Sequence, residues 1–181
     1  MQETRRHLPH HYAPGKPVFV TFRLHGTLPE GRSFPARSLT SGKAFVCMDR
    51  MLDEERAGPS YLKQPAIAKV VISYIAKGAT YDYILHAWVL MSNHVHMLIT
   101  PLVDLPALMR RLKGGSARQC NLLLSRTGPF WQDESYDRRV RGAEEFNKIE
   151  NYILLNPVRA GLAHSPEDYP WSSCGLKPAA G

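Results

Sequence analysis

The chain has 181 residues, 44% of them hydrophobic and 22% charged, which suits one domain with a substantial core and excludes a wholly disordered protein. The net charge of +7 favours a polyanionic partner, most commonly nucleic acid, although a basic protein without such a partner fits the charge equally well. The three cysteines form no Cys-x-x-Cys pair, so we expect neither a zinc ribbon nor a disulfide framework. No apolar run has the length of a membrane span, and we expect a cytoplasmic protein with no membrane partner.

The first half of the chain begins with a basic, His-rich segment that prolines interrupt, and we expect residues 1–16 to form an arm. Apolar residues then alternate with other residues over 18–24, which predicts a strand. Glycines and prolines indicate a loop over 26–37. Helices are expected at 38–56 and at 60–77.

The second half begins with two strands, at 83–90 and 94–100, which form a hairpin. A helix at 105–124 follows, which Gly114 and Gly115 are expected to interrupt. A short strand at 134–141 and a helix at 143–156 complete the pattern. The order predicts an α+β fold: a ferredoxin-like split β-α-β-β-α-β antiparallel sheet with helices on one face, followed by one further helix. This fold serves many functions, so the order alone does not indicate one.

Two histidines on the second strand of the hairpin are the first candidate for chemistry. Side chains alternate along a strand, so His94 and His96 project from the same face while Val95 points to the other. Two imidazoles on one face can chelate a divalent ion. The alternative is that they are ordinary polar residues on an exposed strand face.

Tyr152 and Asn156 on the last helix are the second candidate. Four residues separate them, so one helical turn brings both to the same side, next to an apolar stripe that should dock on the sheet. The alternative is a half-buried tyrosine and an asparagine that ends the helix before Pro157. Together with the histidines, they describe a mechanism: two imidazoles and an amide oxygen hold a divalent cation, and the phenol of Tyr152 attacks a phosphodiester. The product would be a phosphotyrosine intermediate and a free hydroxyl end.

Several segments of the chain resemble one family. Residues 88–96 (Trp-Val-Leu-Met-Ser-Asn-His-Val-His) resemble the HUH motif of single-tyrosine, IS200-like transposases, and residues 152–162 resemble their catalytic helix. Asn four residues after Tyr, followed by Pro-Val, is typical of the REP-associated tyrosine transposases. Further similar segments are residues 5–9, 18–24, 112–118, 130–132 and 170–173. The resemblance covers nearly the whole chain.

This resemblance implies a catalytic domain with a ferredoxin-like fold, which we place at 17–161, between the basic arm at 1–16 and an irregular tail at 162–181. It implies that Tyr152 is the nucleophile and that His94, His96 and Asn156 bind Mg²⁺ or Mn²⁺. It also implies a substrate of single-stranded DNA that contains a short hairpin, cut at palindromic repeats. A homodimer and a monomer are both compatible with the sequence.

Basic residues outside this site are candidates for contacts with the DNA backbone. The set comprises Arg110, Arg111, Lys113, Arg118, Arg138, Arg139 and Arg159. The alternative is a solvated helix face. Phe130 and Trp131 are expected to pack in the core rather than stack on bases, and His86 is expected to be a packed strand histidine.

Two other functions are compatible with this pattern. One is a non-catalytic ferredoxin-like protein that binds single-stranded nucleic acid, although the aromatic Gly-Phe-Gly signature of that class is absent. The other is a metal phosphoesterase with water as the nucleophile. A covalent adduct on Tyr152 would separate the transposase-like enzyme from both.

Overall fold

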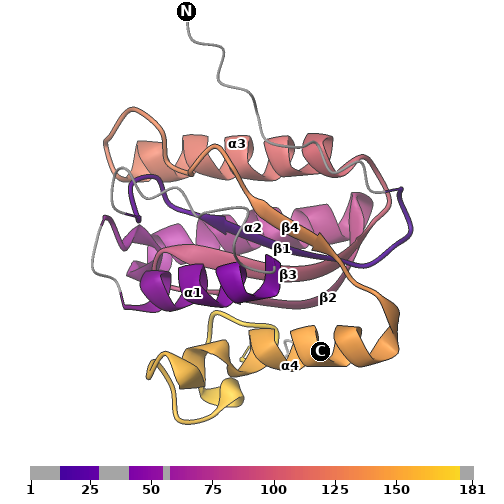
Figure 1. The fold of residues 1–181 in the computed structure, drawn as a ribbon. Helices are drawn as coiled ribbons and strands as arrows, with labels where there is room; N and C mark the ends of the chain where they lie inside the picture. Colours follow the sequence, from indigo (N-terminus) through magenta and orange to yellow (C-terminus); the bar gives the residue numbers. More distant parts are fainter. Residues whose placement is uncertain (1–12, 29–40, 55–57, 176–181) are drawn as a thin grey trace, which may run out of the picture.

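The structure, a computed structural model, describes residues 13–28, 41–54 and 58–175 (Figure 1). Its strands are β1 (Val18–Arg23), β2 (Tyr83–Leu90), β3 (His94–Pro101) and β4 (Tyr136–Arg139). Its helices are α1 (Ser41–Asp53), α2 (Pro65–Tyr81), α3 (Leu105–Leu123) and α4 (Gly142–Arg159), with short 3-10 helices at Tyr61–Lys63 and Pro166–Asp168. Most residues of the predicted arm, 1–12, lie outside the described ranges. None of the helices described is long and apolar enough to cross a membrane.

The strands form one four-stranded sheet in the order β2-β3-β1-β4, and each neighbouring pair is antiparallel. This is the strand order of the split β-α-β-β-α-β fold, so the predicted α+β, ferredoxin-like class is confirmed. β1 and β3 are the two central strands, and Thr21 of β1 lies directly opposite His96 of β3. Side chains near the middle of β3 are therefore shielded by neighbours on both sides.

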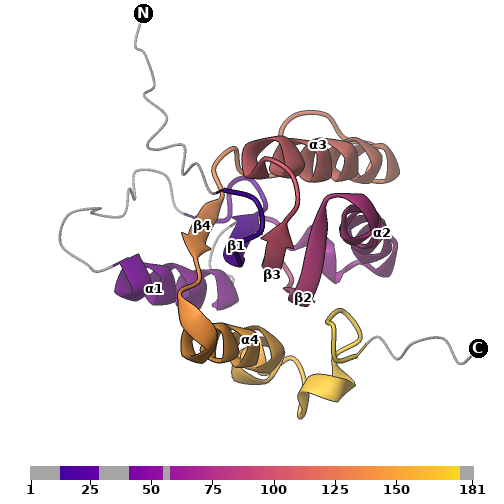
Figure 2. The same cartoon turned by 90° about the vertical axis from the view of Figure 1, so that its right-hand side faces the viewer.

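Helices cover both faces of the sheet (Figure 2). The two helices of the split motif, α2 and α3, pack on one face over a large core that includes Phe22, Val95 and Met97. The last helix, α4, packs on the other face over a smaller core that includes Phe19, Leu98 and Ile153. Figure 2 shows α1 on this second side, next to α4. His94 and His96 alternate with Val95 and Met97 along β3, so they project toward α1 and α4.

The predicted interruption at Gly114 and Gly115 is wrong, because α3 continues through both residues. A Cβ on Gly115 would collide with the ring of Tyr74 in α2, whereas a Cβ on Gly114 would meet no atom within 4 Å. Gly115 therefore allows close packing of α2 against α3. Gly115 thus marks a contact between helices, and neither glycine interrupts α3.

The segment after α4 covers the outer edge of β2. The amide of Leu90 donates to the carbonyl of Trp171 at 2.8 Å, and the amide of Ser173 donates to the carbonyl of Trp88 at 3.0 Å. The hydroxyl of Tyr169 also donates to the carbonyl of Leu90, at 2.8 Å. The expected irregular tail is therefore attached to the sheet through residues 169–173, and 176–181 lie outside the described ranges.

We expect Gly78→Ala to lower the free energy of unfolding by about 1–3 kcal/mol, although alanine is the better helix former. A Cβ at this position of α2 would lie 2.5 Å from Cε1 of Tyr83, a side chain that is 1% exposed. The ring cannot swing away without cost, because its hydroxyl donates to the carbonyl of Ile75 at 2.7 Å. Urea unfolding followed by circular dichroism measures the change.

Gly114→Ala is the matched control, because this glycine also lies inside a helix but has open space around it. We expect it to raise the free energy of unfolding by up to about 1 kcal/mol, as helix propensity predicts. Equal effects of the two substitutions would contradict the contact between Gly78 and Tyr83.

Candidate metal and nucleophile site

The two histidines of β3 face each other on the α1 and α4 side of the sheet. Their Nε2 atoms lie 3.0 Å apart, and both residues are 0% exposed. The prediction that both imidazoles project from one face is therefore confirmed. The alternative, an exposed polar strand face, is wrong, because α1 and α4 cover this side.

The other nitrogen of each ring is held by a hydrogen bond. Nδ1 of His94 lies 2.7 Å from Oδ1 of Asn93, and because an amide oxygen only accepts, the imidazole N–H is the donor. Nε2 of His94 therefore carries a lone pair when the ring is neutral. Nδ1 of His96 is hydrogen-bonded to Oγ1 of Thr21 at 2.7 Å. Histidines that bind metals are commonly oriented by such partners on the second nitrogen.

Asp49 of α1 completes a cluster that the sequence did not predict. Its Oδ1 lies 2.8 Å from Nε2 of His96 and 3.4 Å from Nε2 of His94, and the residue is 1% exposed. The donor atoms of these three residues all lie within 4.8 Å of one another, a spacing at which one metal ion can bind to all of them. The sequence contained one signal: Asp49 precedes Leu52 by three residues, so an acidic side chain shares the buried side of the helix.

The surroundings of this cluster favour an ionised Asp49 and a neutral His94. Burial opposes ionisation of Asp49, but the neighbouring His96 and His94 more than offset this effect and hold its pKa well below the usual range. Burial also lowers the pKa of His94, against the opposing effect of Asp49. A neutral imidazole and a carboxylate are the forms that bind metal ions.

Asn156 of α4 lies next to Asp49. Its Nδ2 donates to Oδ2 of Asp49 at 3.2 Å, and the residue is 1% exposed. Its Oδ1 is buried and accepts no hydrogen bond from any residue that the structure describes. A buried oxygen without a donor is costly unless a cation binds it. The two imidazole nitrogens and the carboxylate oxygen converge closely enough for one divalent ion, and the amide oxygen on the neighbouring Asn156 is a donor of a type that suits the same ion.

Tyr152 lies one turn before Asn156, at the edge of the cluster. The centroid of its half-buried ring is 5.9 Å from that of His96 and 6.3 Å from that of Phe19. Cζ of Arg159, which lies two turns further along α4, is 4.6 Å from the same centroid. The structure thus brings together Tyr152, His94, His96 and Asn156 within a single chain.

His86, the other histidine of this hairpin, does not belong to the cluster. It lies where the register of β2 against β3 shifts, and its Nε2 is hydrogen-bonded to Oγ1 of Thr100 at 2.8 Å. Its ring centroid is 5.0 Å from that of Phe146. His86 is therefore a packed strand histidine, as expected.

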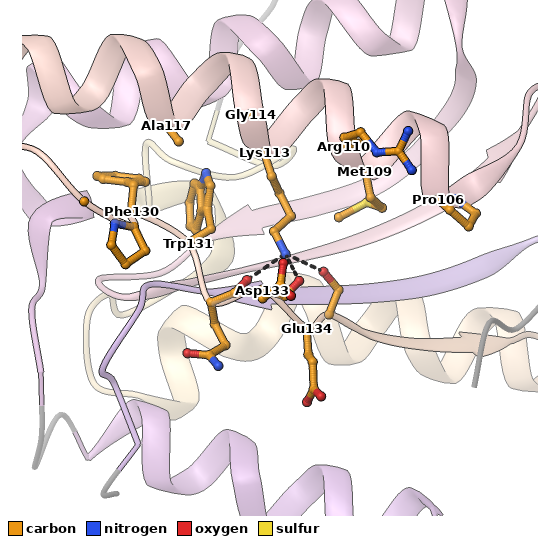
Figure 3. Close-up of a pocket in the computed structure, with 14 residues that line it drawn as sticks. Pro106, Met109, Arg110, Lys113, Gly114, Ala117, Phe130, Trp131, Asp133 and Glu134 are labelled. Carbon is orange, nitrogen blue, oxygen red and sulfur yellow. Dashed lines mark hydrogen bonds between the residues drawn. The ribbon is translucent and has the colours of Figure 1, made fainter. Parts of the chain in front are cut away.

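Lys113 is the candidate for DNA contact whose position differs most from the expectation. Its ammonium donates to the carbonyls of Gln132 at 2.7 Å and Asp133 at 2.8 Å, and to Oγ of Ser135 at 3.1 Å (Figure 3). Burial lowers its pKa to about 8, and Asp133 partly opposes this shift. Lys113 thus fastens the segment before β4 to α3 and lines a cavity of about 590 Å³. All its donors are directed at protein oxygens, so it is poorly placed for a phosphate.

Phe130 and Trp131 line the same cavity but are only 2% and 6% exposed. Nε1 of Trp131 donates to Oγ of Ser116 at 3.0 Å. The expectation that both rings pack in the core is therefore confirmed.

Within the part of the chain that the structure describes, the remaining arginines divide into side chains with and without an ion-pair partner. Arg110, Arg118 and Arg139 are exposed. Arg111 forms an ion pair with Asp82 at 2.7 Å, and Arg138 forms one with Glu145. Both pairs are partly exposed, so they stabilise the protein only weakly and can exchange for a phosphate.

Comparison with known proteins gives three matches. Residues 60–156 match the model of the family described as "Transposase IS200 like". A REP-associated tyrosine transposase of Escherichia coli (strain K12) is 25% identical over 92 residues, which are 49% of this chain and 53% of the relative, so the match spans about half of that protein. A solved structure described as a REP-associated tyrosine transposase bound to a REP hairpin has a TM-score of 0.55 and 20% identity, over 98% of this chain and 89% of that chain. The last match supports the fold, and together the three confirm the resemblance found in the sequence.

Proposed function

Because the chain belongs to the family of IS200-like transposases, we propose that it cuts and rejoins single-stranded DNA with the hydroxyl of Tyr152 as the nucleophile. The observation that carries this proposal is the position of Tyr152, one helical turn from Asn156 and in ring contact with His96. If Tyr152 served only to pack in the core, nothing would require the buried cluster of His94, His96 and Asp49 beside it.

We propose that His94, His96 and Asn156 hold a Mg²⁺ or Mn²⁺ ion, since nitrogen and oxygen donors of this kind suit both. When bound, the ion would neutralise negative charge on a phosphodiester oxygen. The protein contributes fixed ligands, because Asn93 and Thr21 orient the two imidazoles. Both imidazoles are fully buried, so the two nitrogen ligands are themselves shielded from solvent.

In the proposed reaction, the phenolic oxygen of Tyr152 forms a bond to phosphorus as its proton leaves. The bond from phosphorus to a deoxyribose oxygen breaks, and that oxygen takes up a proton to become a free hydroxyl end. A hydroxyl of a second DNA end then attacks the phosphotyrosine and restores the phenol. Phe19 and Arg159 contact the Tyr152 ring and hold it in place for these steps.

We propose that Tyr152 acts in its own subunit, since its ring lies beside that of His96 of the same chain, and both a monomer and a homodimer are compatible with this arrangement. We propose the cytoplasm as the compartment, which fits the free thiols of Cys47, Cys120 and Cys174. We also keep the proposed division into an arm at 1–16, a catalytic domain at 17–161 and a tail at 162–181.

We propose DNA with a hairpin and a single-stranded flank as the substrate, as in the solved relative that is bound to a REP hairpin. We propose that the exposed Arg110, Arg118 and Arg139 are the side chains most available for phosphates. Arg111, Arg138 and Arg159 are less available, because each already contacts another side chain. Lys113 instead binds the segment before β4. Recognition of the stem would then rest on shape and charge.

Binding of a hairpin oligonucleotide should weaken steeply with salt. If about four phosphates are neutralised, raising the salt from 50 to 200 mM should reduce the affinity about 100-fold. Arg118→Ala should lower both the affinity and the salt dependence, as measured by fluorescence anisotropy. Lys148→Ala is the control, because Lys148 is an exposed lysine that pairs with Glu144 at 2.6 Å and lies outside the proposed set. Equal affinity for a blunt duplex and for the flanked hairpin would contradict the proposed substrate.

A further inference from the structure

Helix α1 brings a carboxylate into the proposed metal site from outside the segment that the family model matches, 60–156. We propose that Asp49 is a fourth protein ligand and that the bound ion thereby fixes α1 against the sheet. This inference rests on the proposed function, because it concerns the same site. Asp49 would be an additional residue of the proposed metal site, and it would couple the binding of the ion to the docking of α1 on the sheet.

The contacts of Asp49 support a role as a ligand. Its Oδ1 lies 2.8 Å from Nε2 of His96, and the two Nε2 atoms lie 3.0 Å apart. The lone pair of His94 Nε2 is available, because the N–H of its Nδ1 donates to Asn93. Electron-pair donors that converge so closely in a buried place repel one another unless a proton or a cation lies among them. A divalent cation satisfies all of them at once.

A hydrogen bond from Asn156 of α4 fixes the orientation of the Asp49 carboxylate. Nδ2 of Asn156 donates to Oδ2 of Asp49, which leaves Oδ1 for the histidine side of the cluster. The amide oxygen of Asn156 is itself buried and accepts no hydrogen bond from the described part of the chain. Asp49 and Asn156 thus offer one oxygen each from two different helices. The anionic oxygen adds attraction for a cation that neutral ligands lack.

A second contact joins α1 to the same site. Nδ2 of Asn93 donates to the carbonyl of Leu52 at 2.9 Å, and Oδ1 of Asn93 accepts from His94. The side chain of Leu52 is 0% exposed. An ion bound by Asp49 and His94 therefore stabilises α1 at two neighbouring points. By linkage, an ion that binds only the docked form of α1 also favours that form.

The test is Mn²⁺ binding by isothermal titration calorimetry on the full chain, with wild type, Asp49→Asn, His96→Ala and Glu54→Gln. We expect Asp49→Asn to weaken Mn²⁺ binding about 10–100-fold. Glu54→Gln is the matched control: it removes one negative charge from the end of the same helix, where Glu54 pairs with Arg50 at 3.4 Å, and binding should stay within about twofold of wild type. Melting curves in EDTA show whether each variant is folded.

Hydrogen exchange supplies a second readout. Mn²⁺ should slow exchange of the amides of 46–53 in wild type and in Glu54→Gln, but not in Asp49→Asn. Wild-type affinity and wild-type protection in folded Asp49→Asn would overturn the inference. If His96→Ala abolishes binding while Asp49→Asn keeps it, only the role of Asp49 fails. If folded His96→Ala also binds Mn²⁺ like wild type, the proposed metal site itself is wrong.

Discussion

Replacing Tyr152 with phenylalanine is expected to reduce DNA cleavage by about 10³-fold or more while leaving folding and DNA binding unchanged. The substitution removes the attacking oxygen, and a water molecule in its place would lack the positioning that α4 provides. The ring contacts with Phe19, His96 and Arg159 remain, so the free energy of unfolding should change by less than about 1 kcal/mol. Cleavage of a labelled hairpin oligonucleotide in Mn²⁺ measures the rate.

Tyr136→Phe is the control for this experiment. The ring of Tyr136 also lies 6.3 Å from that of Phe19, with an edge-to-face geometry like that of Tyr152. The same hydroxyl is lost, but from β4 and not from the helix that carries Asn156. We expect cleavage within about threefold of wild type. A Tyr152→Phe variant that cuts as fast as Tyr136→Phe would show that another group is the nucleophile.

Replacing His96 with alanine is expected to weaken Mn²⁺ binding more than about 100-fold and to abolish cleavage with it. The imidazole contacts Asp49 at 2.8 Å and Thr21 at 2.7 Å, and it is fully buried. Its removal leaves the Asp49 carboxylate without its nearest partner. We therefore also expect the free energy of unfolding in EDTA to fall by about 2–4 kcal/mol. Calorimetry and urea unfolding separate the two effects.

His86→Ala is the matched control, since it removes a histidine from the neighbouring strand. His86 contacts Phe146 and Thr100 and none of the donors of the cluster. The variant should lose some stability but bind Mn²⁺ within about twofold of wild type. If both alanine variants lost Mn²⁺ affinity equally, the loss would reflect a general disturbance of the sheet and not the removal of a ligand.

The sequence predicted the parts of the molecule that repeat a local pattern. Alternation along β3 was enough to place His94 and His96 on one face, and helical spacing placed Tyr152 beside Asn156. Both patterns depend only on the backbone geometry of one element. The order of elements then predicted the sheet, because a split β-α-β-β-α-β chain has few compact arrangements.

Local sequence patterns could not predict contacts between elements that are far apart in the sequence. Asp49 lies on a helix whose position on the sheet no local pattern determines, so its approach to His96 was missed. Lys113 was predicted to contact the DNA backbone, because nothing in the sequence indicated that the carbonyls of Gln132 and Asp133 would accept hydrogen bonds from its ammonium. Gly115 was read as an interruption, because the ring of Tyr74 comes from another helix. In each case the partner lies on another element or loop and is brought close only by tertiary packing.

The most direct test of the central claim is mass spectrometry of the wild-type protein after incubation with Mn²⁺ and a single-stranded oligonucleotide that contains a hairpin. The account predicts a protein whose mass has increased by that of a DNA fragment, and peptide mapping should place the fragment on Tyr152. Cleavage without an adduct would contradict the account, because water would then be the nucleophile. An adduct on Tyr136 or another tyrosine would equally contradict it, and binding without any cleavage would indicate a non-catalytic DNA-binding protein.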